Sequence, residues 1–396
     1  SGELVLHNYM DFDNLKDYVK ISYELTQDGL LIGKGKLDEV SVVPHSEGKT
    51  NLQVNVPENG KCYLKLIYHL KKEMPLLEED YILGFDEIEV SQKDAKCQLA
   101  EKWVEKTVTD SELQVSEDDT QIHIKGREFA YTIDRRTALF TEMKFAGREY
   151  LNHPMELNIW RAPTDNDMYI KSEWKKAHYD KAYTRAYTTE VVQGKHGVKI
   201  TSHASVVAET VQKILDVTIT WKIEAAGKID ADIAVTKDDE FPDLPRFGVR
   251  MFLDKKLSAV RYFGMGPQES YCDKHQAASH GLYHANVDDL HEDYIRPQEN
   301  GSHYDCEYVE LNNSRYGIVA SAEKAFSFNA SYYTQEELEK KTHNYELIES
   351  DSVVFCVDYA LNGIGSNSCG PVVLDQYRFD DVLFRFQFTL IPYVKR

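Results

Sequence analysis

The chain has 396 residues, of which 46 are Lys or Arg and 66 are Asp or Glu, so its formal net charge is −20. This length is sufficient for two or three domains, each able to bury a hydrophobic core. The negative charge argues against nucleic acid or an anionic membrane as a partner, because phosphate groups would be repelled.

Alternating apolar and polar residues predict β-strands over most of the chain. In chain order, strands are expected near residues 19–25, 64–70, 215–223, 229–235, 353–359 and 382–390. The clearest pair is a hairpin that turns at Gly227, with one dry face and one wet face. Helical signals are few. Thr334 and Glu337 form a capping-box pattern that predicts a helix near 335–342, and Ser172 is expected to cap a helix that carries Trp174.

The segment 91–112 is polar and interrupts the alternation, so we place a domain boundary there. We predict a β-sandwich over residues 1–100, a linker over 101–112, and one large antiparallel β domain over 113–396. The expected fold class is therefore all-β.

Composition and targeting signals point to a cytoplasmic protein. No apolar run approaches the roughly 18–20 residues of a membrane span, and the first residues lack a basic region followed by an apolar one. The six cysteines contain no CxxC pair, so we expect reduced thiols rather than disulfides.

Well-known catalytic and metal-binding motifs are missing from the sequence. It contains no GxSxG, GxxxxGK[ST], GxGxxG or HExxH motif, so nucleotide binding and serine-hydrolase chemistry have no support. The histidines at 275, 280, 284 and 291 suggest a zinc site. Their spacing is irregular, and no cysteine or carboxylate completes a recognisable ligand set. We therefore expect solvated or hydrogen-bonded histidines and no metal.

Three loops are dense in polar and turn-forming residues: 160–167, 264–273 and 363–371. In the first, Asp165 and Asp167 are two residues apart and could point to the same side of an extended chain. Turns built by Pro and Asx side chains account for the same composition. Binding residues also gather on polar loops that project from a rigid β scaffold. Both interpretations stay open at this point.

At these loops the sequence resembles a known family. WRAPTDND, GPQESYCD followed by PQENG, YYTQEEL and NGIGSNSCGP occur in one order. Together they resemble the C-terminal large β domain of the LacZ-type β-galactosidases of glycoside hydrolase family 2. The N-terminal part is similar to the immunoglobulin-like domain that precedes it in those enzymes. The resemblance covers essentially the whole chain and implies a galactose mutarotase-like β supersandwich for the second domain.

The resemblance implies that the catalytic machinery lies elsewhere. In this family the two catalytic glutamates belong to a (β/α)₈ barrel, which needs about 250 residues of alternating strand and helix. That alternation is absent here. Retaining hydrolysis needs two carboxyl groups roughly 5–5.5 Å apart. Glu269 and Asp273 are the nearest pair in the sequence, and we expect a structural or rim role for them. We therefore name no catalytic residue.

The expected function is that of the C-terminal part of a cytoplasmic β-galactosidase, one that hydrolyses terminal β-D-galactosides such as lactose with retention. This portion, inactive alone, would support and rim the sugar pocket. The expected rim residues, which follow from the resemblance, are Arg161, Asp165, Asn166, Asn367, Ser368 and Cys369. A family member has Trp before a Ser-Pro in the last loop. Cys369 stands before Gly370 here, so stacking on the aglycone sugar is in doubt.

No cofactor is expected in this part, whereas Mg²⁺ and a monovalent cation belong to the complete enzyme. Expected partners are the β-galactoside, the missing domains and further copies in a homo-oligomer. Two alternatives remain. One is a stand-alone carbohydrate-binding or assembly module. The other is an aldose 1-epimerase, which would need a Glu base and a His acid. Its candidates are Glu269 or Glu299 with His275, His280 or His303.

Overall fold

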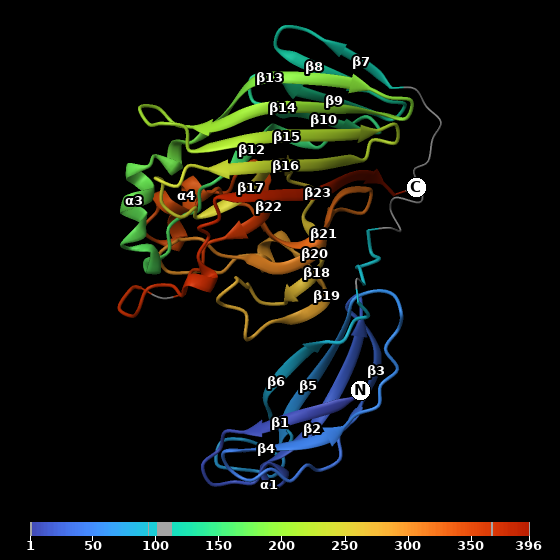
Figure 1. Cartoon of the computed structure of the whole chain (residues 1–396), viewed down its shortest axis with the longest axis vertical. Coiled ribbons are helices and arrows are strands. Elements are labelled where there is room, and N and C mark those ends of the chain that lie inside the picture. Colours follow the sequence, from blue (N-terminus) through green and yellow to red (C-terminus); the bar gives the residue numbers. More distant parts are fainter. Residues whose placement is uncertain (1, 94, 101–112, 366, 396) are drawn as a thin grey trace. The chain divides into compact units, whose positions relative to one another are not determined.

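The computed structural model describes residues 2–93, 95–100, 113–365 and 367–395 (Figure 1). The chain divides into two compact units. One comprises Ser1–Gln98 with His280–Leu282, and the other comprises Leu99–Ser279 and Tyr283–Arg396. The predicted linker at 101–112 lies outside the described residues. Among the described residues, no helix combines the length and the hydropathy needed to cross a membrane.

The first unit is a small β-sandwich. Its elements are β1 (Glu3–Asn8), α1 (Leu15–Tyr18), β2 (Val19–Gln27), β3 (Leu30–Lys36), β4 (Ser46–Asn51), β5 (Cys62–Leu70) and β6 (Ile82–Glu89). Strands β1 and β4 form one sheet, and the other has the order β3-β2-β5-β6. Leu6 of β1 packs with Ile21 of β2 and Leu64 of β5 in one core. The strands predicted near 19–25 and 64–70 are thus confirmed as β2 and β5.

The second unit opens with a five-stranded antiparallel sheet. Its strands are β7 (Gln114–Glu117), β8 (Gln121–Lys125), β9 (Phe129–Asp134), β10 (Leu139–Phe145) and β11 (Arg148–Glu149). They follow one another in space as they do in sequence, in the order β11-β10-β9-β8-β7. Tight turns between neighbouring strands account for this meander.

The rest of the second unit is dominated by a sheet in which twelve described strands pair. They are β12 (Leu151–Asn158), β13 (Tyr183–Gln193), β14 (Gly197–Val207), β15 (Leu215–Glu224), β16 (Ile229–Lys237), β17 (Arg246–Asp254), β18 (Ala259–Gly266), β19 (Ser279–Asn286), β20 (Ser302–Asn312), β21 (Tyr316–Ser331), β22 (Ser352–Leu361) and β23 (Leu383–Val394). The main order is β12-β17-β22-β21-β23-β16-β15-β14-β13, with β18, β19 and β20 branching from β21 (Figure 1). The predicted all-β fold class is confirmed.

One large core in the second unit contains residues of both of its sheets. Along β15, buried residues alternate with residues that have exposed surface, as the hairpin prediction required. Trp221 of β15 is fully buried, and its indole nitrogen donates to the Ala138 carbonyl at 2.8 Å. The Tyr131 hydroxyl of β9 donates to the Gly227 carbonyl at 2.7 Å. Two aromatic side chains therefore fix the five-stranded sheet against the hairpin while keeping their polar atoms satisfied.

The two longest helices of the described residues lie in connections of the second unit. Helix α4 (Gln335–Lys340) begins where the capping box predicted, with the Thr334 hydroxyl accepting from the Glu337 backbone N–H at 3.1 Å. It ends two residues before the predicted limit. Helix α3 (Ile170–Lys176) differs from the prediction, because it begins at Ile170 and Ser172 lies inside it. The Ser172 hydroxyl donates back to the Tyr169 carbonyl at 2.8 Å and so caps nothing.

The core packing of β23 generates a stability prediction. Phe386 is 3% exposed, so the Phe386→Ala variant leaves a cavity and should lose about 3–5 kcal/mol of unfolding free energy. Urea unfolding followed by tryptophan fluorescence measures this loss. Arg385→Ala is the control, because the neighbouring side chain is exposed and its ion pair with Asp232 contributes about 1 kcal/mol or less. Equal losses in the two variants would contradict the assignment of faces.

Candidate functional site

The polar loops predicted from the sequence lie together at one edge of the large sheet. Strands β12 and β22 both pair antiparallel with β17, so they run in the same direction and end at the same edge. The loop 160–167 follows β12, and the segment 362–369 follows β22. Residues that are about 200 positions apart in sequence thereby become neighbours.

Arg161 joins the first and third loops from the inside. Its side chain is fully buried. Nε and Nη2 donate to the two carboxylate oxygens of Asp167 at 3.1 and 2.7 Å. Nη1 donates to the Asn362 carbonyl, and Nη2 also reaches the Gly363 carbonyl at 3.2 Å. The guanidinium carbon lies 5.3 Å from the centre of the Trp174 ring. Arg161 thus positions the loops, with none of its surface open to solvent.

Asp165 of the first loop is exposed and Asn166 is half-buried. The Asn166 side-chain amide donates to the Ile364 carbonyl at 2.7 Å and also to the Gly365 carbonyl. The Asp165 backbone N–H donates to the Gln298 side chain at 3.0 Å. Each residue is therefore fixed by a neighbouring segment while part of its side chain stays accessible.

Asp273 holds the third loop by its backbone. Its two carboxylate oxygens accept from the N–H groups of Ile364 and Gly365 at 3.0 and 2.7 Å. A Cβ atom at Gly363 or at Gly365 would lie 2.8 Å from the Asp273 carboxylate, which is too close for any other residue without movement. The Gly-Ile-Gly spacing is the sequence signal for this close approach, which sequence reasoning did not assign to Asp273.

Asn367, Ser368 and Cys369 extend beyond this fixed part of the loop. Ser368 and Cys369 are exposed, and Asn367 has a left-handed backbone with φ of 93°. Within the described part of the chain, none of their side chains forms a hydrogen bond with another residue. The structure therefore brings Arg161, Asp165 and Asn166 together with the base of the third loop, and it leaves the other three predicted residues at the tip.

A second buried arginine, Arg246, lies near the same edge of the large sheet. Arg246 of β17 donates to Asp358 of β22 at 2.6 and 3.2 Å and to Glu299 at 3.3 and 3.4 Å. The Glu299 backbone N–H donates to the Ala162 carbonyl at 3.0 Å, which ties the segment 297–301 to the first loop. Burial raises the pKa of both Glu299 and Asp358, although the nearby Arg246 opposes the shift.

Glu269, weighed with Asp273 as a carboxyl pair, is also occupied in holding loops. It accepts from the Gly301 backbone N–H at 2.8 Å and from the side chains of Tyr294 and Lys274. Both carboxylates therefore have a structural role here. Glu299 and His303, weighed as the base and the acid of epimerase chemistry, are 4% and 1% exposed. Neither presents its functional group to a substrate.

The histidines at 275, 280, 284 and 291 do not assemble with other ligands. No group of three or more His, Cys, Asp or Glu side chains in the described part of the chain has the geometry of a metal site. His275, for example, uses Nδ1 in a 3.0 Å hydrogen bond with the Tyr271 carbonyl. The described residues therefore offer no ligand set to a resident metal.

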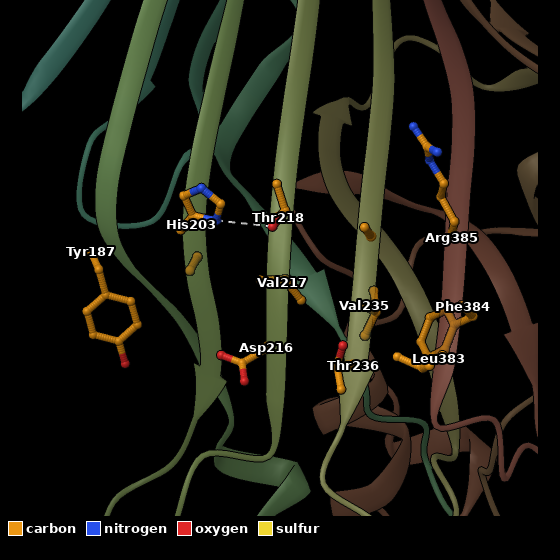
Figure 2. Close-up of a pocket in the computed structure, with 12 residues that line it drawn as sticks. Tyr187, His203, Asp216, Val217, Thr218, Val235, Thr236, Leu383, Phe384 and Arg385 are labelled. Atoms are coloured by element: carbon orange, nitrogen blue, oxygen red, sulfur yellow. Dashed lines mark hydrogen bonds between the residues drawn. The ribbon is translucent and has the colours of Figure 1, made fainter.

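A separate hollow, which no residue of these loops lines, lies across five strands of the large sheet (Figure 2). Tyr187 and Leu383 lie at opposite sides of the view, with Asp216 and Thr236 between them. His203 Nδ1 is 3.2 Å from the Thr218 hydroxyl, and Asp216 pairs with Lys213 at 2.5 Å. This hollow contains none of the residues that the sequence singled out.

Comparison with known proteins assigns the chain to a family. The family model described as beta galactosidase small chain matches residues 125–390, and the one described as beta-galactosidase domain 4 matches residues 4–91. The chain belongs to the β-galactosidase small-chain family. The resemblance seen in the sequence, to glycoside hydrolase family 2, is thereby confirmed.

Curated β-galactosidases match over nearly the whole chain. The chain is 42% identical over 392 residues to the β-galactosidase of Actinobacillus pleuropneumoniae, covering 98% of this chain and 38% of that protein. It is 29% identical over 394 residues to that of Staphylococcus xylosus, with the same two coverages. The β-galactosidase of Kluyveromyces lactis is 28% identical over 403 residues, covering 98% and 36%. The chain thus spans little more than a third of these relatives.

Among solved structures, two sugar epimerases match part of this β-galactosidase family member with low scores. Galactose 1-epimerase from Lactobacillus acidophilus matches with a TM-score of 0.39 and 8% identity, covering 73% of this chain and 100% of that one. An aldose epimerase homologue from C. elegans matches with a TM-score of 0.34 and 8% identity, covering 72% and 99%. At this level the likeness supports no assignment of activity.

The Arg161–Asp167 pair generates a stability prediction. Asp167→Asn removes the charge that balances a fully buried guanidinium, so the variant should lose about 3–5 kcal/mol of unfolding free energy. Asp165→Asn is the matched control on an exposed carboxylate of the same loop and should change stability by about 0.5 kcal/mol or less. Denaturant unfolding compares the two. A loss near zero for Asp167→Asn would contradict the positioning role of the pair.

His303 generates a prediction of pH dependence. Burial lowers its pKa from 6.5 to about 4, so the folded protein resists protonation of a group that the unfolded chain protonates readily. Stability should therefore fall as the pH drops from 6.5 towards 4, by about 3 kcal/mol from this residue alone. The difference in unfolding free energy between His303→Gln and the parent chain, followed across this range, isolates the effect. A difference that stays constant with pH would refute it.

Proposed function

We propose that this chain is the part of a β-galactosidase that supports and rims the sugar pocket, in an enzyme that hydrolyses terminal β-D-galactosides with retention. The supporting observation is that both units match consecutive parts of β-galactosidases. The chain spans 38% of the A. pleuropneumoniae relative, which leaves ample length there for a barrel of about 250 residues. The catalytic glutamates would belong to that barrel.

The rim would be formed by Asp165 and Asn166 together with residues 367–369. Support comes from accessibility: these residues have exposed surface, whereas the base of both loops is fixed by buried ion pairs. A rigid base with accessible polar groups suits recognition of sugar hydroxyls, because little ordering remains to be done on binding. Arg161 would act as a positioning residue. Cys369 offers less surface than an aromatic residue to an aglycone sugar.

The complete enzyme would take its other requirements from outside this chain. Mg²⁺ and a monovalent cation would bind to the catalytic domains. Its partners would be those domains, the galactoside substrate and further copies in a cytoplasmic homo-oligomer. A charge of −20 is compatible with a neutral sugar substrate, because such a substrate is not repelled.

Hydrolysis of o-nitrophenyl β-D-galactoside tests this proposal. The chain alone should show no turnover above buffer. Addition in trans of the portion of the A. pleuropneumoniae relative that this chain does not match should restore it. In the restored enzyme Asn166→Ala should lower kcat/KM about 10-fold, the effect of losing one positioned polar contact. Asp375→Asn, an exposed carboxylate elsewhere in the second unit, is the control.

Two results would count against the proposal. Turnover by the chain alone would show that it contains its own catalytic groups. Equal activity of the Asn166→Ala and Asp375→Asn enzymes would remove the rim role while leaving membership of the family untouched.

A further inference from the structure

A hollow of about 300 Å³ lies beside the base of the third loop, between β20, β22 and the segment 376–381. It is a separate space from the rim, since neither Asp165, Asn166 nor residues 367–369 line it. Its walls carry six side chains of mixed character: Tyr304, Asp305, Tyr359, Tyr377, Arg378 and Asp381. Its size falls at the lower end of the range of small-ligand pockets.

The aromatic walls are held rigidly by the surrounding structure. The Tyr359 ring stacks on Phe384 with centroids 4.8 Å apart and planes 16° from parallel. Tyr304 stacks on His275 with centroids 5.6 Å apart and planes at 27°. Both rings are half-buried. A ring fixed in this way presents a flat apolar surface at little entropic cost to binding.

Several polar groups of the hollow have no protein partner. Among the described residues, the hydroxyls of Tyr304, Tyr359 and Tyr377 and the carboxylate of Asp381 form no hydrogen bond or ion pair within the chain. Partial burial raises the pKa of Asp381, and the neighbouring charge of Asp380 raises it further. Three hydroxyls that can donate or accept thus lie in one cavity with a carboxylate that only accepts.

The backbone at the hollow is also unusual. Asp305 has a φ of 53°, in the left-handed region that non-glycine residues seldom adopt. It lies where the register of β20 against β21 shifts between His303 and Cys306. Such bulges turn a side chain in a new direction and are frequent next to binding sites. Here the bulge places Asp305 in the wall of the cavity.

The charges and shapes of the hollow select the ligand class. Asp305 and Asp381 would repel an anion. Arg378 is already paired with Asp243 at 2.8 Å, which leaves little charge to hold one. A purely apolar ligand would leave the unpartnered hydroxyls unsatisfied. A neutral pyranose has both an apolar face for a tyrosine ring and hydroxyls for tyrosines and carboxylates.

We propose that this hollow is a binding site for a neutral hexose. The proposal is independent of the galactoside-hydrolysing function, because it concerns different residues and involves no chemical step. The site would anchor one sugar unit at a fixed place beside the loops of the candidate rim. Its affinity should lie in the millimolar range, because the hollow is small for a ligand site.

Saturation-transfer-difference NMR on the whole chain tests the proposal, with D-galactose, D-glucose and lactose as separate probes. At least one sugar should receive saturation from the parent chain. The Tyr359→Phe/Asp381→Asn double variant keeps the ring stacking and the shape of both side chains, and it should weaken binding at least 10-fold. Circular dichroism and the midpoint of urea unfolding confirm that the variant is folded.

A matched control places the binding site within the chain. Tyr187→Phe makes the same Tyr-to-Phe change in the hollow of Figure 2. It should leave the saturation transfer unchanged. The absence of transfer to all three sugars would overturn the proposal. Transfer that survives in the folded double variant, or that is lost on Tyr187→Phe, would also overturn it by assigning binding to another surface.

Discussion

The buried ion pair between Arg161 and Asp167 is the constraint on which the polar edge of the second unit depends. A charged group that is removed from water must form its hydrogen bonds with the protein. Otherwise the free-energy cost of its desolvation exceeds the gain from its attraction to the opposite charge. The guanidinium is therefore surrounded by Asp167 and the carbonyls of Asn362 and Gly363. Those carbonyls cannot move without exposing an unpaired charge. Two loops that could each be mobile by composition are thereby fixed relative to each other.

A second buried arginine, Arg246 of the large sheet, is also paired with carboxylates, but here the charges do not balance. Arg246 faces two carboxylates, Asp358 and Glu299, so this cluster contains one more acid than base. Burial raises the pKa of both acids, and the charge of Arg246 opposes that rise. The backbone N–H of Glu299 also donates to the Ala162 carbonyl. The same residue therefore joins the buried charge cluster to the loop 160–167.

Local patterns in the sequence predicted the strands well and the environment of individual loop residues poorly. Alternation identifies β15 and β16 because one face of that hairpin is dry. Arg161 could not be recognised as buried, because its neighbours Pro163, Thr164 and Asp165 have the composition of a surface turn. Its partners at 362 and 363 are distant in sequence. The role of Asp273 could not be predicted for the same reason, because its partners are also distant in sequence. They are the backbone N–H groups of Ile364 and Gly365, and a pattern of side chains does not indicate backbone hydrogen bonds.

The position of β23 has a consequence for the order in which the molecule forms. This strand pairs with β16 on one side and with β21 on the other, so it joins the β13–β16 meander to the strands that carry the candidate site. Its residues 383–394 are the last strand of the described chain. During synthesis on the ribosome, the other described strands of this sheet emerge before the one that unites them. Until β23 is made, the edges of β16 and β21 that it pairs with stay open. Open strand edges are prone to pair with the wrong strand.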